Sequence, residues 1–141
     1  MTAPDPRYNR ISESFARQTI MTTLRAELVD IAPGRVVIAA PLLPDFRQQH
    51  GAGHAGVTFA LGDSAAGYAA LTRIPEDREV MTVEMKINLL APALGDRLVA
   101  TGEVLRPGRR LLIVRATVHV QRDGAQVQVA ELLGTMIPVD A

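Results

Sequence analysis

One stretch of small and apolar residues, 56–72, stands among segments with strand patterns, and it constrains the fold more than any other feature. Its larger apolar side chains recur at helical spacing, at Val57, Leu61, Ala65, Tyr68 and Leu71. Pro75 follows as a terminator. Because the stretch is apolar nearly all round, we expect a buried helix with a sheet wrapped over it. Gly62 and Gly67 each lower helix propensity by about 1 kcal/mol relative to alanine, which indicates close backbone approach at both positions.

Strand patterns account for most of the remaining chain. We expect strands over residues 24–31, 35–41, 80–90, 97–105, 111–121 and 126–137, and a short helix over residues 9–19. The turns between successive strands are too short for parallel crossovers, so the sheet should be antiparallel. The sequence therefore predicts an α+β fold, an antiparallel β-sheet around one long central helix, in a single domain over residues 1–141. Residues 1–19 form an N-terminal helical segment of that domain.

Composition excludes several classes of function. The chain has 141 residues, 48% of them hydrophobic, and its 15 basic and 15 acidic side chains cancel. No net field therefore draws it to nucleic acid or to anionic lipid. It has no cysteine, which excludes a disulfide scaffold and a thiol nucleophile. No apolar run has the length of a membrane span or of a signal peptide, so we expect a cytoplasmic protein without membrane contact.

A polar, Gly-rich loop runs directly into the expected helix. It reads Gln48-Gln49-His50-Gly51-Ala52-Gly53-His54-Ala55-Gly56. A helix N-terminus has unpaired N–H groups and a partial positive charge, which suit a polarised carbonyl or a developing oxyanion. The alternative is that the glycines only form a tight turn.

Asp63 is a second unusual feature, because it interrupts the apolar helix. Burying an unpaired carboxylate is costly, so its presence indicates a functional role, an N-cap of a shorter helix or a solvent-facing edge. Ala55 and Asp63 are about 12 Å apart along a helix, too far for one carbonyl to contact both. Two antiparallel helices in a symmetric dimer would bring the loop of one subunit beside the Asp63 of the other. The spacing thus predicts a site shared between subunits.

The remaining candidates are weaker. The three histidines lack the spacing of metal ligands, and no nucleotide-binding fingerprint is present, so we expect no metal and no bound cofactor. Arg106, Arg109 and Arg110 cluster at one turn, where they are either solvated or partners for phosphate groups.

The motif resembles that of the hotdog-fold acyl-CoA thioesterases, in the phenylacetate-degradation and 4-hydroxybenzoyl-CoA thioesterase branch. The likeness rests on Gln48, Gly51, His54 and Gly56, followed by Asp63 nine residues after the histidine. The segment from Met81 to Asn88, the turn from Pro92 to Gly95 and the pair Gly108-Arg109 extend it over most of residues 20–138. The resemblance implies a hotdog fold and hydrolysis of an acyl-CoA to a free acid and coenzyme A, which is part of the substrate.

The resemblance also implies roles for single residues. Asp63 would be the nucleophile or the general base, and the amide N–H of Ala55 would polarise the thioester carbonyl. Gln48 would orient the thioester or the water, and His54 would shape the loop and contact the thioester. Gly56 belongs to the same set of catalytic residues. Thr82 stands where some members position water with a serine. Arg109 and Arg110 would contact the phosphates of coenzyme A.

Two departures and two alternatives accompany this interpretation. Ala55 replaces the first glycine of the usual His-Gly-Gly, and Gly67 stands where one branch has a hydroxyl residue. Gly67 and its small neighbours Ala65, Ala66 and Ala69 would leave a roomy or aromatic acyl pocket. A non-catalytic acyl-CoA-binding or sensing module is the main alternative function, and a hotdog dehydratase is the second. We also expect a homo-oligomer, either a homodimer or a homotetramer built as a dimer of dimers.

Overall fold

The structure, a computed structural model, describes residues 5–141. The first four residues of the expected N-terminal segment lie outside the described residues. In chain order the elements are η1 (Pro6–Tyr8), α1 (Asn9–Arg17), α2 (Thr19–Thr23), β1 (Glu27–Ala32), β2 (Arg35–Pro41), η2 (Pro44–Phe46), α3 (Ala55–Leu71), β3 (Arg78–Leu89), β4 (Arg97–Pro107), β5 (Leu112–Arg122) and β6 (Ala125–Asp140). The long central helix and all six strands are confirmed, with no boundary shifted by more than three residues.

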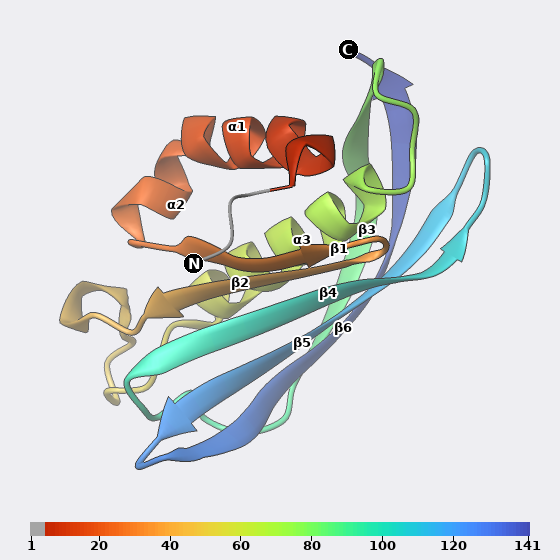
Figure 1. Ribbon diagram of the computed structural model, residues 1–141. Coiled ribbons are helices and arrows are strands. Elements are labelled where there is room, and N and C mark those ends of the chain that lie inside the picture. The colour runs from red at the N-terminus through yellow and green to blue at the C-terminus, as the bar shows by residue number, and fades with distance from the viewer. Residues whose placement is uncertain (1–4) are drawn as a thin grey trace.

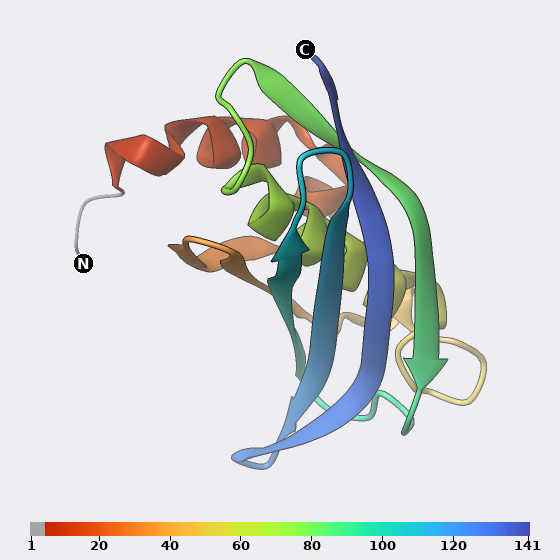
Figure 2. The same ribbon diagram turned by 90° about the vertical axis from the view of Figure 1, so that its right-hand side faces the viewer.

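The six strands form one antiparallel sheet in the order β1-β2-β4-β5-β6-β3. Short turns join β1 to β2, β4 to β5 and β5 to β6, which makes each of these pairs antiparallel neighbours. The sheet curves around α3, which lies along its concave face (Figures 1 and 2). This arrangement is the hotdog fold, so the expected α+β architecture is confirmed.

The interface between α3 and the sheet is the core of the molecule. Leu61, Ala65, Ala66 and Ala69 are fully buried on the sheet side of the helix. Their small side chains bring the helix backbone so close to β4 that a Cβ on Gly102 would lie 2.2 Å from the Ala65 carbonyl. The proposal that Ala65, Ala66 and Ala69 leave room for an acyl group is therefore wrong, because packing against the sheet consumes that room.

The two glycines of α3 differ from each other. A Cβ on Gly62 would lie 2.9 Å from the end of the buried Leu132 side chain, so a larger residue there would crowd the core. A Cβ on Gly67 would meet only the tip of Met136, at 3.8 Å, which is ordinary contact. The expected close approach of another backbone is thus wrong at both positions, because Gly62 is crowded by a side chain and Gly67 is not crowded at all.

The N-terminal segment is a pair of short helices rather than one helix over residues 9–19. Gln18 has an extended backbone (φ −81°, ψ 94°), which ends α1 and lets α2 begin at the next residue. Leu24 caps α2, so β1 begins at Glu27 rather than at residue 24. Both helices pack over α3 and the sheet edge through the buried side chains of Ile11 and Met21.

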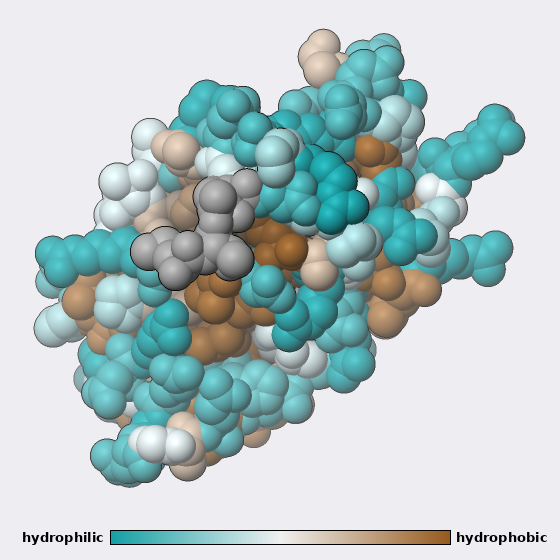
Figure 3. Space-filling view, viewed as in Figure 1, coloured by the Kyte–Doolittle hydropathy of each residue, from teal (hydrophilic) through white to brown (hydrophobic). Residues whose placement is uncertain are grey.

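Strand β3 forms one outer edge of the sheet and exposes large apolar side chains. Met81 and Val83 are 57% and 56% exposed. The face of the molecule in Figure 3 is, by contrast, mostly hydrophilic. An exposed apolar edge strand can pair with another chain, so proteins usually cover such an edge. No helix within residues 5–141 is long and apolar enough to cross a membrane.

Candidate active site

The Gly-rich loop is fastened to the sheet before it enters α3. Gly53 donates a backbone hydrogen bond to Ala93 at 2.9 Å, and a Cβ at this glycine would lie 2.9 Å from Leu42. The guanidinium of Arg47 donates to the carbonyl oxygens of Leu42, Gly51 and Gly95 at 2.8–3.1 Å. The sequence analysis missed Arg47, whose three carbonyl contacts make the loop a rigid entry to the helix.

His54 caps the N-terminus of α3. Its Nδ1 atom accepts a 2.8 Å hydrogen bond from the backbone N–H of Gly56, so in the neutral ring the proton sits on Nε2. A Cβ on Gly56 would lie 3.0 Å from this nitrogen, which explains the glycine. The N–H of Ala55, at the first helical position, has no acceptor within residues 5–141. Ala55 is exposed, so this amide is accessible to a bound carbonyl oxygen.

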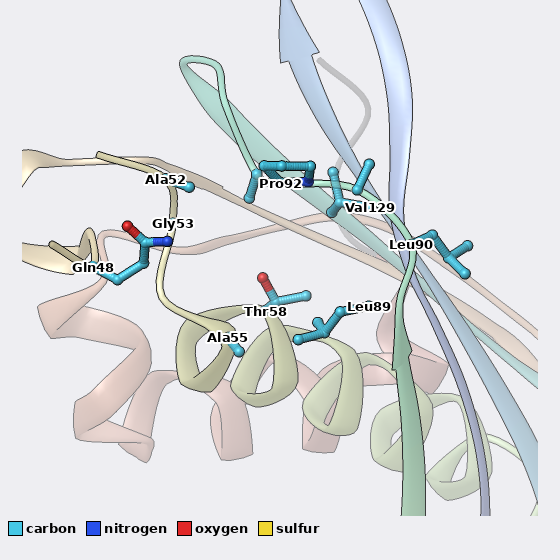
Figure 4. Close-up of a pocket in the computed structure, with 11 residues that line it drawn as sticks. Gln48, Ala52, Gly53, Ala55, Thr58, Leu89, Leu90, Pro92 and Val129 are labelled. Atoms are coloured by element: carbon cyan, nitrogen blue, oxygen red, sulfur yellow. The ribbon is translucent and has the colours of Figure 1, made fainter. Parts of the chain in front are cut away.

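The loop and the first turns of α3 line a pocket of about 390 Å³. In Figure 4, Gln48 and Ala52 border it on one side, Ala55 and Thr58 come from the helix, and Leu89 closes the other side. The Oε1 atom of Gln48 accepts a 2.5 Å hydrogen bond from the N–H of His50, which leaves the side-chain NH2 as a donor. The pocket therefore combines an amide donor, the Ala55 N–H and an apolar wall.

Asp63 lies on the middle of α3 and faces a second pocket of about 220 Å³. Its side chain is half-buried, and its Oδ1 atom accepts a 2.8 Å hydrogen bond from the hydroxyl of Thr82 on β3. The carboxylate is thus neither a helix cap nor buried without a partner. Gly67, one turn further along α3, lines the same pocket.

Four polar residues of this second pocket were not among the expected site residues: Ser14, Gln18, Ser64 and Tyr68. Ser14 and Gln18 lie four residues apart near the end of α1, at a spacing that places them on the same helix face as the buried Ile11. This spacing is the sequence signal that could have indicated a polar pair turned toward the protein interior. Glu79, an exposed residue of β3, supplies a second carboxyl group at the pocket edge.

The structure separates the expected site residues into three groups. Gln48 and Ala55 border the first pocket, with His54 as the adjoining helix cap, whereas Asp63 and Thr82 border the second. Arg109 and Arg110 are exposed in the turn between β4 and β5, and neither of them lines these two pockets. Among residues 5–141, no cluster of three or more His, Asp or Glu side chains could hold a metal ion.

A hotdog sheet whose Gly-rich loop opens onto the central helix, with a carboxylate further along that helix, defines a thioesterase-type domain. The chain belongs to the thioesterase superfamily, whose sequence model matches residues 50–126. The match spans the loop from His50 onward, α3 and strands β3 to β5.

Individual relatives agree with this assignment. A Saccharolobus solfataricus protein, named provisionally as an esterase, is 30% identical over 74% of this chain and 74% of its own length. The 1,4-dihydroxy-2-naphthoyl-CoA hydrolase of Listeria monocytogenes is 28% identical over 64% of this chain and 73% of its own.

Two solved structures superpose closely on this chain. A thioesterase family protein from Silicibacter pomeroyi has 39% identity and a TM-score of 0.93, covering 96% of this chain and 99% of its own. The E. coli PaaI protein from the phenylacetic acid degradation operon has a TM-score of 0.86 over 96% and 94% of the two chains. At 20% identity, this second likeness concerns the fold alone.

Proposed function

We propose that the protein hydrolyses an acyl-CoA thioester to a free carboxylic acid and coenzyme A. The observation that carries the proposal is the Asp63 carboxylate, which faces a pocket and is held by the Thr82 hydroxyl at 2.8 Å. Relatives support the reaction class, because the Listeria monocytogenes protein is named as the hydrolase of a CoA thioester.

Asp63 supplies the attack on the thioester by one of two routes. As a general base it takes a proton from water, and the resulting hydroxide attacks the carbonyl carbon. As a nucleophile it forms a mixed anhydride, which water then hydrolyses. In both routes the C–S bond breaks and coenzyme A leaves as its thiolate, which takes up a proton. The thioesterase proposal requires only that this carboxylate be ionised and next to the carbonyl.

The Ala55 amide stabilises the negative charge that develops on the carbonyl oxygen. It is an unpaired N–H at a helix N-terminus, where backbone dipoles favour negative charge. The NH2 group of Gln48, at the same pocket, orients the thioester or the attacking water. His54 and Gly56 act indirectly, because their hydrogen bond fixes the first turn of the helix.

The complete site forms between two subunits of a homodimer. Ala55 and Asp63 are separated by about 12 Å of helix, so one carbonyl cannot contact both within a chain. Two α3 helices that lie antiparallel across a two-fold axis bring the Ala55 amide of one subunit beside the Asp63 of the other. The exposed apolar edge of β3 supports this assembly, because it offers a surface that a second copy can cover.

Arg109 and Arg110 bind the phosphates of coenzyme A in this proposal. Both side chains are exposed at a turn and make no ion pair within residues 5–141. Guanidinium groups form strong, bidentate hydrogen bonds with phosphate, so two neighbouring arginines suit the charged end of the substrate.

A thiol-release assay over short, long and aryl acyl-CoAs tests the proposal. We expect turnover by the wild type and a loss of roughly 10²–10⁴-fold in kcat for Asp63→Asn, which keeps the shape of the side chain and removes its charge. Asp77→Asn, at an exposed loop position outside both pockets, is the matched control and should leave kcat unchanged. Full activity of Asp63→Asn would end this mechanism. Tight acyl-CoA binding without turnover by the wild type would favour a binding module instead.

A further inference from the structure

The pocket beside Asp63 continues past the carboxylate to a polar wall. This wall consists of Ser14 and Gln18 from the end of α1 together with Ser64 and Tyr68 from α3. Hydrolysis of a thioester needs one attacking group and one oxyanion donor, and it makes no use of four additional polar side chains. The wall therefore requires an explanation of its own.

The polar wall is a connected hydrogen-bond network in which some donor hydrogens are not used. The side-chain NH2 of Gln18 donates to the Tyr68 hydroxyl at 2.9 Å, and the Oε1 atom of Gln18 accepts from Ser64 at 3.3 Å. The hydroxyls of Tyr68 and Ser14 lie 3.1 Å apart and share one hydrogen. One amide hydrogen of Gln18 and one hydroxyl hydrogen therefore have no acceptor within residues 5–141. The network presents donors to whatever enters the pocket.

The wall is held rigidly. Tyr68 is only 6% exposed, and its ring packs edge-on against Phe15 at 6.1 Å between centroids. The guanidinium of Arg10 donates to carbonyl oxygens at the end of α3 and in the following loop, which ties α1 to that helix. Donors that are fixed in advance cost little entropy when they bind a ligand.

Gly67 opens the path from Asp63 to this wall. It lies one turn after Asp63 on the same side of α3 and lines the same pocket. Glycine is, after proline, the least favourable residue in a helix interior, and close packing does not require one here, since a Cβ would meet only Met136 at 3.8 Å. The missing side chain instead leaves room in the pocket. Gly67 and the polar wall are separate observations, and both indicate that a ligand occupies this pocket.

We propose that Gln18 and Tyr68 determine acyl specificity, and that the preferred acyl group is short, passes over Gly67 and carries a neutral hydrogen-bond acceptor, such as a hydroxyl, at its far end. This inference rests on the proposed function, since it places the thioester at Asp63. A carboxylate at the far end is disfavoured, because Asp63 and Glu79 border the same pocket.

The dimensions set the length of the acyl group. Asp63 and Tyr68 are five residues apart, which corresponds to about 7.5 Å along a helix. An extended chain advances roughly 1.2 Å per bond, so about six bonds separate the carbonyl carbon from the polar end. The pocket of about 220 Å³ lies below the roughly 300–1,000 Å³ of pockets for drug-sized ligands, which favours a short acyl group over a fatty chain.

Binding of two non-hydrolysable probes tests the inference independently of turnover. S-(2-oxoheptyl)-CoA and its 7-hydroxy counterpart keep the carbonyl but carry a methylene between sulfur and carbonyl, and they differ only in the terminal hydroxyl. By calorimetry we expect the wild type to bind the hydroxylated probe about tenfold more tightly, which is the value of one good hydrogen bond. Equal affinities, or no binding of either probe, would overturn the proposal.

Two variants remove the wall's hydrogen bonds. Gln18→Leu and Tyr68→Phe should bring the affinity ratio of the two probes close to one and leave the affinity for the unsubstituted probe within about twofold. Tyr8→Phe lies outside the pocket and should keep the tenfold ratio. A ratio that persists in both wall variants would exclude these residues as its source.

Gly67→Ala tests whether the acyl group passes over Gly67, and the fold has room for the added methyl group. We expect a several-fold loss of affinity for both probes and a melting temperature equal to or above that of the wild type. Gly62→Ala, in the same helix but outside the pocket, should instead lower the melting temperature. Unchanged probe affinity in Gly67→Ala would contradict the proposed path. Hydrolysis of plain acyl-CoAs by the wild type, without a preference between the probes, would leave the proposed function intact and refute only this inference.

Discussion

The Thr82 hydroxyl donates a 2.8 Å hydrogen bond to the Asp63 carboxylate and so joins the outer strand β3 to the middle of α3. A register shift between Thr82 and Glu84 lies beside this contact. Such a bulge re-aims the side chains of its strand, and bulges are frequent next to active sites. The bond fixes the orientation of the only carboxylate on α3.

Removal of the Thr82 hydroxyl should impair catalysis without unfolding the protein. A hydrogen bond to a charged group contributes about 1.5–3 kcal/mol, so we expect Thr82→Val to lower kcat roughly tenfold or more. Thr82→Ser keeps the donor and should retain most of the wild-type kcat. Steady-state measurement of kcat for the two variants tests this prediction. A Thr82→Val enzyme as fast as the wild type would show that this bond does not contribute to the reaction.

Two impaired variants, of which Gln48→Ala should lose less activity than Asp63→Asn, should complement each other if the site is shared. In a heterodimer of Asp63→Asn and Gln48→Ala chains, one of the two sites holds an intact Gln48 and an intact Asp63. Random pairing of co-expressed chains makes half of the dimers mixed, so we expect about a quarter of the wild-type activity. Each variant alone provides the baseline. Activity that does not rise above these baselines would place the whole site within one chain.

The paired arginines should affect substrate binding rather than chemistry. We expect the double variant Arg109→Ala, Arg110→Ala to raise KM several-fold for acyl-CoA substrates with little change in kcat, since phosphate contacts lie far from the reacting bond. The wild-type KM should also rise with salt, and this dependence should weaken in the variant. Arg122→Ala, at the exposed end of β5, is the matched control. Wild-type kinetics in the double variant would leave the two arginines without a role in binding.

Arg10 should stabilise the whole fold. Its guanidinium donates to the carbonyl oxygens of Leu71, Ile74, Pro75 and Arg78 at 2.6–3.0 Å. Loss of these bonds by Arg10→Ala should cost about 1–3 kcal/mol of unfolding free energy and lower Tm by roughly 3–10 °C. The exposed Arg7, which pairs with the neighbouring Asp5 and lies over the Tyr8 ring, is the control, and Arg7→Ala should change Tm little. Equal Tm values for the two variants would refute this role of Arg10.

Local patterns predicted the secondary structure well where one residue type dominates a segment. The apolar run over residues 56–72 became α3 (Ala55–Leu71), because the helix cap and the terminating turn are encoded by residues next to its ends. The strand expected over residues 35–41 coincides with β2. The break at Gln18 was missed, because an extended residue between two helices depends on how both helices pack rather than on local propensity.

The sequence alone determined that this chain forms a buried small-residue helix, that a Gly-rich loop precedes it and that a carboxylate interrupts it. These features follow from residue types and spacings within about twenty positions. Only the tertiary structure decided what surrounds the carboxylate. Gln18 reaches Tyr68 across 50 residues, and Thr82 reaches Asp63 across 19. Such contacts depend on the register of β3 in the sheet and on the docking of α1 against α3, and side-chain packing over the whole domain fixes both.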